Sequence, residues 1–300
     1  VEAGAAAFIF GSNQPGMLAP TGSIGKDTPA VGLAHEQAAR IRRLLSKGPL
    51  HARLQLSSAV HTAAARNIVG EIPGTDPSQG WIVACGHYDG HDIAQGAGDN
   101  AAGTAVLMEA ARLLSPLREH LQIGIRFVLF SGEELGLFGS YSYAAVHDGE
   151  MDSIRAIFNA DVVGMAMPLV LLPQSSPELS DWFKALPLED LDVKVNDSPK
   201  VFIMNSDHFP FSEKGVQAVW AVTSHPTSGG GWGHTAADTL DKVEPRLLRQ
   251  TTAAVTRLLL RMSASAASLP KGRKSPEQVK QSLIDAGFEK SLRFKNHWPF

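Results

Sequence analysis

Apolar strand-like runs alternate with helix-like runs along most of this chain, and that alternation constrains its fold more than any other feature. Between residues 65 and 262 the strands are expected at 65–74, 80–90, 121–134, 153–164 and 214–224, and the helices at 100–114, 135–147, 178–186 and 245–262. Such a succession is typical of domains in which helices cover both faces of a mostly parallel sheet. We therefore predict an α/β fold with a mostly parallel central sheet.

Shorter segments flank this region on both sides. Residues 1–62 contain strand-like runs at 6–10, 29–34 and 51–58 and an amphipathic helix at 35–48, which together predict a small β-α-β segment. Residues 11–25 are rich in Gly, Pro and Ser and are expected to form a loop. A basic run and a short helix at 276–287 follow near the C-terminus. The chain is thus expected to divide into residues 1–62, 63–263 and 264–300.

The composition argues against some classes of partner. Charged residues make up 19% of the 300 residues, and the formal net charge is −3, which gives no support for a nucleic-acid or anionic-membrane partner. The sequence has no run of about 18 or more apolar residues, so we expect no membrane span. The one cysteine, Cys85, cannot form an internal disulfide, and its apolar neighbours predict a buried core residue.

Acidic and histidine side chains recur where the expected strands end. In chain order they are His87, Asp89, Asp99, Glu133, Glu134 and Asp161, and His234 follows in a glycine-rich loop. Each alone is an ordinary turn or helix-start residue, but the carboxyl ends of parallel strands meet at one edge of the sheet. Carboxylates gathered there repel one another unless a cation neutralises them. Because imidazole and carboxylate groups suit Zn²⁺, the pattern predicts a zinc site at this edge.

Five motifs in a fixed order carry a family resemblance. They are GHYDGHDIAQGAGDNAAG, VLFSGEELGLFGS, NADVVG, SDHFPFSEKGVQAV and GHTAADTLDKVE. The series resembles that of the two-zinc (co-catalytic) aminopeptidase family, which also contains glutamate carboxypeptidases, the plasma-type carboxypeptidase and the one-zinc glutaminyl cyclases. The resemblance covers residues 65–262 and implies the zinc exopeptidase fold and a peptide substrate. Residues 1–62 are similar to the second half of a protease-associated domain.

The family resemblance implies a role for each of these side chains. Two zinc ions per chain would be bound, the first by His87 and Asp161, the second by Glu134 and His234, and both by the bridging Asp99, while Glu133 would be the general base and Asp89 would orient His87. These roles imply hydrolysis of a terminal peptide bond by metal-bound hydroxide. Glu133 would take a proton and return it to the leaving amine. Most of the other histidines, His91 among them, are expected to lie at the surface.

Three positions add detail to the resemblance. Gly233 stands where several relatives have a Tyr that helps to hold the oxyanion, so the oxyanion partner is open. Relatives with a bridging Asp imply a cis peptide bond between Asp99 and Asn100. Asn100 is also expected to cap the helix 100–114, because its side chain can accept an early N–H.

The retained ligands and Glu133 argue against a non-catalytic relative, and mildly against a one-zinc glutaminyl cyclase. The residues do not decide between an aminopeptidase and a carboxypeptidase or dipeptidase, since neither an acid for a free amine nor a cation for a free carboxylate can be located. The stretch DGHDIAQGA is similar to the plasma-type carboxypeptidase, whereas the family as a whole favours an aminopeptidase. The family also implies a secreted or periplasmic location. The first residues show no signal peptide, and we expect further sequence to precede them.

Overall fold

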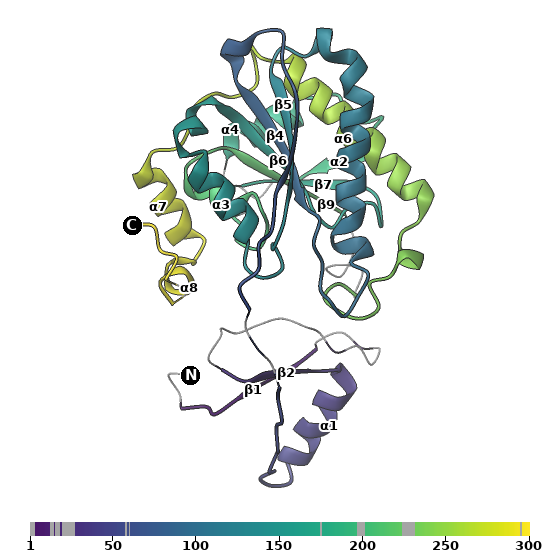
Figure 1. Ribbon diagram of the computed structural model, residues 1–300, viewed down its shortest axis with the longest axis vertical. Coiled ribbons are helices and arrows are strands. Elements are labelled where there is room, and N and C mark those ends of the chain that lie inside the picture. The colour runs from purple at the N-terminus through teal and green to yellow at the C-terminus, as the bar shows by residue number, and fades with distance from the viewer. Residues whose placement is uncertain are drawn as a thin grey trace.

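A computed structural model of the chain describes residues 4–12, 15, 19, 28–57, 59, 61–174, 176–196, 202–223, 232–294 and 296–300. Within these residues seven strands form one sheet in the order β3-β5-β4-β6-β9-β7-β8, and β1 and β2 form a separate pair. Strands β5, β4, β6 and β9 run parallel, whereas β3 and β7 run antiparallel to their neighbours β5 and β9. The predicted α/β fold with a mostly parallel central sheet is confirmed (Figure 1).

The elements have the following bounds. The strands are β1 Phe8–Gly11, β2 Ala30–Leu33, β3 Ile68–Ile72, β4 Trp81–His87, β5 Gly124–Phe130, β6 Ile154–Ala160, β7 Leu169–Pro173, β8 Val193–Val195 and β9 Ala218–Thr223. The helices are α1 His35–Leu45, α2 Ala102–Leu114, α3 Phe138–Val146, α4 Pro177–Lys184, α5 Phe209–Glu213, α6 Pro245–Ala264, α7 Pro276–Asp285 and α8 Glu289–Phe294. Among the described residues, none of the helices combines the length and the apolar character that a membrane crossing requires.

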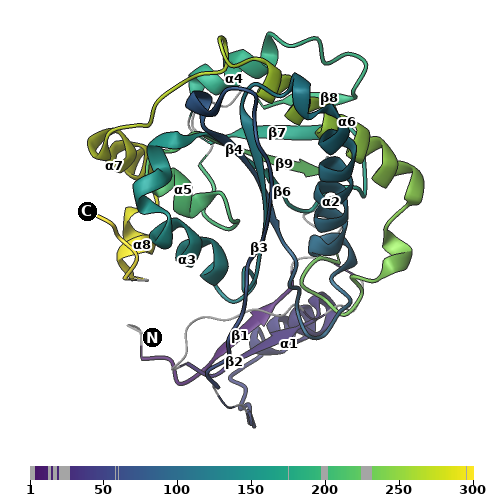
Figure 2. The same cartoon turned by 45° about the horizontal axis from the view of Figure 1, so that its top comes forward.

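Strand β4 shows why the sheet is covered on both faces. Ile82 and Ala84 join the core formed with α2 and α6, whereas Val83 and Cys85 join the core formed with α3 and α5. All four side chains are fully buried. Successive side chains of a strand point to opposite faces, so a strand buried on both sides requires an unbroken apolar run. Figure 2 shows α2 and α6 on one side of the sheet and α3 and α5 on the other, and Cys85 is a core residue as predicted.

The N-terminal segment differs from the β-α-β expectation. Strands β1 and β2 pair in parallel, and α1 follows them, but residues 51–57 form no strand. Leu54 and Leu56 in that stretch are exposed. An alternating pattern produces a strand only where a neighbouring strand offers hydrogen bonds and a surface to cover, and no described residue pairs with this stretch. The segment is therefore β-β-α. The loop expected at residues 11–25 lies mostly outside the described residues.

The chain passes from this segment into the main sheet at the edge where the parallel strands end. Strand β3 is antiparallel to β5, and its first residue, Ile68, pairs with Leu129 near the carboxyl end of β5. Just before β3, the carbonyl of Arg66 accepts a hydrogen bond from the Tyr88 hydroxyl at 2.7 Å. Figure 1 shows β1, β2 and α1 beyond this end of the sheet.

Two strands and the tail packing were not predicted from the sequence. Strand β7 follows β6 without an intervening helix and returns antiparallel to β9, so it falls outside the strand-helix alternation. Strand β8 is three residues long. In the C-terminal tail, Val279, Leu283 and Leu292 pack against Phe202 and Phe209. Helices α7 and α8 therefore belong to the packed body of the molecule.

Candidate metal centre

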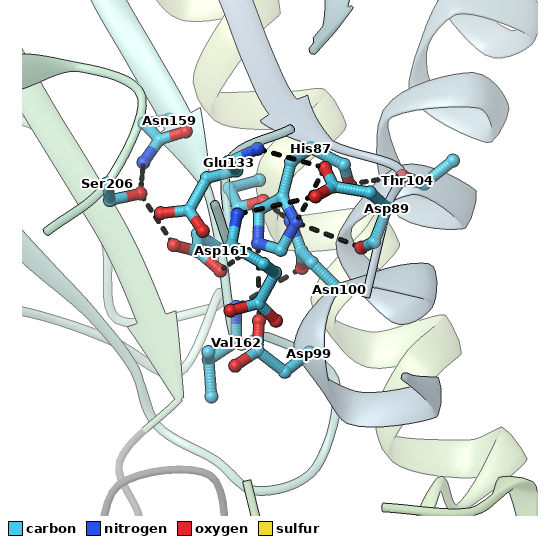
Figure 3. Close-up of polar contacts among 12 residues, drawn as sticks. His87, Asp89, Asp99, Asn100, Thr104, Glu133, Asn159, Asp161, Val162 and Ser206 are labelled. Carbon is cyan, nitrogen blue, oxygen red and sulfur yellow. Dashed lines mark hydrogen bonds and ion pairs between the residues drawn. The ribbon is translucent and has the colours of Figure 1, made fainter. Parts of the chain in front are cut away.

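The structure brings the acidic and histidine side chains together at the carboxyl edge of the sheet. His87 is the last residue of β4, Asp161 directly follows β6, and Glu133 and Glu134 follow β5. Asp99 lies in the turn Ala97–Ala101 that leads into α2. The side chains of His87, Asp99 and Asp161 point toward one another (Figure 3). Parallel pairing of β5, β4 and β6 is the cause, because it places the ends of these strands side by side.

Asp99 lies between two histidines. Its Oδ1 is 3.2 Å from Nε2 of His87, and its Oδ2 is 3.2 Å from Nε2 of His234. Each histidine also faces a carboxylate of its own. His87 Nε2 is 3.3 Å from Asp161 Oδ1, and His234 Nε2 is 3.3 Å from Glu134 Oε2. The site thus consists of two histidine–carboxylate pairs that share one further carboxylate.

These spacings suit metal ions. Tetrahedral zinc with ligands at about 2.0–2.1 Å sets its ligand atoms about 3.3 Å apart, close to the distances just given. His87, Asp99 and Asp161 are buried, and Oε1 of Glu134 is buried without a hydrogen-bond partner among the described residues. A buried acidic oxygen without a partner is costly unless a cation occupies the adjacent space. The donor set therefore fits a metal centre.

Asp89 orients both sides of the site. Its carboxylate accepts the N–H of Glu133 at 3.2 Å and the N–H of Glu134 at 3.3 Å. Nδ1 of His87 lies 3.1 Å from the Asp89 carbonyl oxygen and 3.6 Å from its Oδ1. Because Nδ1 is engaged by Asp89, Nε2 of His87 is left to face Asp99 and Asp161.

Asn100 does not cap α2. Its side chain donates to the carbonyl of Ala160 at 3.0 Å and accepts the N–H of Val162 at 3.2 Å. The cap position is Ala101, without a side-chain cap bond. The capping expectation is wrong because the Asn100 side chain ties the turn to the end of β6 on either side of Asp161. The expectation of a cis peptide bond between Asp99 and Asn100 is confirmed.

A buried chain of hydrogen bonds holds Asp161 through the carboxylate oxygen that does not face His87. Ser206 Oγ donates to Asp161 Oδ2 at 2.5 Å, and Asn159 Nδ2 donates to Ser206 Oγ at 2.5 Å. Asn159 Nδ2 also lies 3.2 Å from Nδ1 of His208, whose Nε2 lies 3.1 Å from the carbonyl oxygen of Ile203. The network assigns the proton of His208 to Nε2. Burial lowers the pKa of His208 to about 3, so its ring is neutral. Ser206 occupies one oxygen of Asp161 and leaves the other toward His87.

Asp238 supports the turn that carries Asp99. Its two carboxylate oxygens accept the N–H of Gly98 at 2.7 Å and the N–H of Asp99 at 3.0 Å. The residue is 2% exposed. Asp238 lies four positions after His234, in the same stretch. This stretch therefore supplies one candidate metal ligand, His234, and also supports the turn that carries a second candidate ligand, Asp99. The sequence pattern assigns Asp238 no role, because an Asp near a histidine in a loop is an ordinary turn residue.

Replacing Asp238 by Ala is expected to weaken metal binding by about 10–100-fold, the range seen when a group that orients a ligand is removed. The turn loses its two acceptors, and the carboxylate of Asp99 is no longer held between the histidines. Zinc titration against a chromophoric chelator measures the effect. Asp241→Ala is the matched control, because the Asp241 side chain is 70% exposed in the same stretch. Equal affinities for the two variants would show that Asp238 does not position Asp99.

Protons compete with a cation for the acidic and histidine side chains of this site. Burial, with the charge of Asp161, raises the pKa of Glu133 to about 10. Burial and the charge of Asp99 raise the pKa of Glu134 to about 8. Burial acts to lower the pKa of His87, but its acidic neighbours, with Asp161 first, outweigh burial and raise that pKa well above its usual value. Metal binding at such a site releases protons and weakens as the pH falls.

Chelation should therefore destabilise the fold. An ion present at about 1,000 times its dissociation constant stabilises the native state by about 4 kcal/mol. Since about 1 kcal/mol moves the melting temperature by about 2–4 °C in proteins of 150–250 residues, we expect EDTA to lower it by roughly 10 °C. Calorimetry with EDTA, and with EDTA already saturated by Zn²⁺ as the control, measures the shift. A melting temperature that EDTA leaves unchanged would argue against a metal at these buried acids.

His91 also lies at the site, which the sequence pattern did not predict. It was expected at the surface, but its side chain is 12% exposed and its Nε2 lies 2.8 Å from Glu134 Oε2. Burial and the charge of His234 lower its pKa, which favours the neutral ring that a metal ligand requires. A signal was present in the spacing His87, Asp89, His91, because a histidine at the end of β4 is followed by an acid and a second histidine on the short loop after that strand.

Comparisons with known proteins place the chain among peptidases. Residues 67–259 match the family model of Peptidase family M28. The chain is 25% identical to aminopeptidase YwaD of Bacillus subtilis over 94% of this chain and 61% of that protein. It is 30% identical to the probable leucine aminopeptidase 2 of Arthroderma benhamiae over 54% of this chain and 33% of that protein. Carboxypeptidase Q of Xenopus laevis is 30% identical over 50% of this chain and 32% of that protein. The chain thus spans less than two thirds of the length of each of these relatives.

A solved structure agrees on the fold. The crystal structure of a peptidase M28 precursor from Shewanella amazonensis superposes with a TM-score of 0.74 at 24% identity, over 91% of this chain and 64% of that one. The matched family region contains His87, Asp99, Glu134, Asp161 and His234, and so includes all of the side chains that meet at the carboxyl edge of the sheet. This chain belongs to Peptidase family M28.

Proposed function

We propose that the protein is a zinc-dependent exopeptidase, an aminopeptidase that holds two zinc ions per chain. One observation carries the proposal: the two oxygens of Asp99 face Nε2 atoms of two different histidines, each at 3.2 Å. A carboxylate placed in this way can bridge two cations. Since each histidine also has its own carboxylate nearby, two metal positions can form side by side.

The residues divide into two sets around Asp99. His87 and Asp161 would hold one zinc, and Glu134 and His234 would hold the other. When bound, the zinc ions lower the pKa of a water molecule and polarise the carbonyl of the substrate. The protein holds these ligands through buried contacts, with Asp89 behind His87 and Ser206 behind Asp161. These contacts hold His87 and Asp161 in position.

Glu133 is the proposed general base. Its backbone N–H is held by Asp89, and its carboxylate groups with His87 and Glu134 at the site. From there it can take a proton from the attacking water and later give it to the amine of the leaving peptide. Its pKa, raised by burial to about 10 without metal, would fall beside the zinc ions and approach the working pH, as proton transfer in both directions requires.

Release of an N-terminal residue is favoured over release of a C-terminal one. The support is that YwaD and the leucine aminopeptidase 2 relative are both named for aminopeptidase activity. A carboxypeptidase is the second candidate, and the match to carboxypeptidase Q supports it. These activities require opposite recognition groups, an acid for a free amine or a cation for a free carboxylate.

A substrate panel distinguishes the candidates. Aminoacyl-p-nitroanilides with a free amine should be hydrolysed, whereas the same compounds with a blocked amine and N-blocked dipeptides should not. Glu133→Gln protein serves as the background for a contaminating peptidase. Hydrolysis of only the N-blocked dipeptides would identify a carboxypeptidase. Ammonia release from peptides with N-terminal glutamine, without hydrolysis of any panel member, would identify a cyclase and overturn the proposal.

A further inference from the structure

We propose that His91 is an additional nitrogen ligand of the metal position formed by Glu134 and His234. The inference rests on the proposed two-metal function and extends it. It gives the site two chemically different positions. The metal position next to His87 has one imidazole and the carboxylates of Asp161 and Asp99. The metal position next to His234 has two imidazoles and the carboxylates of Glu134 and Asp99.

The position of the His91 ring supports this assignment. Its Nε2 lies 2.8 Å from Oε2 of Glu134, the same oxygen that lies 3.3 Å from Nε2 of His234. The two imidazole rings meet edge to face, with centroids 4.4 Å apart. One ligand atom from each of the three residues lies within 4.8 Å of the others. The two nitrogens and this oxygen therefore surround a common space.

The contact between His91 and Glu134 lacks the alignment of a hydrogen bond. Nε2 of His91 and Oε1 of Glu134 are both buried without a hydrogen-bond partner among the described residues. A native structure seldom leaves two such atoms without a hydrogen bond in one place, because each loses its interaction with water. A cation between the rings would satisfy both the nitrogen and the carboxylate.

The backbone around His91 holds it in this place. Asp89, two residues earlier, accepts the N–H groups of Glu133 and Glu134. The same short loop therefore binds the backbone N–H of Glu134 through Asp89 and contacts the carboxylate of Glu134 through His91. Gly90 allows the loop to approach the turn of Asp99, since a Cβ there would lie 3.2 Å from the Cα of Gly96. His91 is thus fixed relative to Glu134 by the loop that also orients His87.

A second imidazole changes the metal preference of its position. Imidazole suits Zn²⁺, Cu²⁺ and Ni²⁺, whereas carboxylate suits Mn²⁺ and Mg²⁺. We therefore expect the position around His234 to keep zinc when Mn²⁺ is added, while the position around His87 exchanges first. Crystals grown with both metals, measured with anomalous scattering at the zinc and manganese edges, show which metal occupies each position.

The test compares His91→Ala, His91→Gln and the control His120→Gln, in which the replaced histidine is exposed. Zinc affinity is measured by competition with a chromophoric chelator. Both His91 variants should lose at least about 10–100-fold in affinity at one of the two positions, since even a group that only orients a ligand has an effect of that size. The control should match wild type. Retention of full affinity by His91→Gln, with loss in His91→Ala, would make His91 a hydrogen-bonding partner of Glu134 and overturn the proposal.

A zinc-loaded crystal structure gives an independent reading. The proposal expects Nε2 of His91 at about 2.0–2.1 Å from the zinc that His234 binds. A zinc at that position with His91 beyond bonding distance would overturn the His91 assignment and leave the two-metal proposal intact. Wild-type protein that binds fewer than two zinc ions would instead overturn the two-metal proposal, so the two failures are distinguishable.

Discussion

Replacing Glu133 by Gln is expected to lower kcat by about 10²–10⁴-fold, the usual contribution of general acid–base catalysis. The amide keeps the shape of the side chain but cannot take a proton. The zinc content should stay at the wild-type level, because His87, Asp161, Glu134 and His234 remain. Steady-state kinetics on an aminoacyl-anilide and elemental analysis of the same preparation measure both quantities.

The neighbouring Glu134→Gln is the matched control for this prediction. It has the same chemical change one residue away, but its carboxylate lies 3.3 Å from His234 Nε2, so it should lose metal. Excess zinc should restore part of the activity of Glu134→Gln and none of the activity of Glu133→Gln. Near-normal turnover by Glu133→Gln would show that another group moves the proton.

Replacing Asp99 by Asn should abolish the shared site. The amide has one oxygen and an NH₂ group, so it can face one histidine with an acceptor but not both, and it carries no charge between the two cations. We expect affinity for at least one metal ion to fall more than the about 100-fold seen for groups that only orient ligands. Activity should fall with it, because both positions contribute to the reaction.

Asp92→Asn is the control for this change, since Asp92 is exposed on the loop between His87 and Asp99. It should bind two metal ions and keep its activity. Isothermal titration with zinc, after removal of bound metal, compares the variants. An Asp99→Asn protein with two tight zinc equivalents would refute the bridging role.

The main features of the fold could be predicted from the sequence because its strands are buried on both faces. The apolar run before His87 can form only a central strand, and its alternate side chains pack against α2 and α3. The strand expected at residues 51–58 was wrong, because its alternating pattern has no partner strand among the described residues. β7 was missed because its pairing with β9 depends on a chain reversal that local periodicity does not record.

Local sequence patterns also predict only part of the site. His87, Asp161 and the two glutamates could be predicted to meet, because strand ends in a parallel sheet share an edge. His91, Asp238 and the contacts of Asn100 could not be predicted, because they depend on how loops fold over that edge. Asn100 has the residue type and position of a helix cap, yet tertiary contacts with Ala160 and Val162 take its side chain instead.

The zinc content of the dialysed wild-type protein decides whether each chain holds a two-metal site. Inductively coupled plasma spectrometry, together with anomalous scattering at the zinc edge in crystals, measures both the number of ions and their place. We expect two zinc ions per chain, one on each side of the Asp99 carboxylate, with His87 at one and His234 at the other. A single zinc, or none, in protein that hydrolyses its substrate would contradict it.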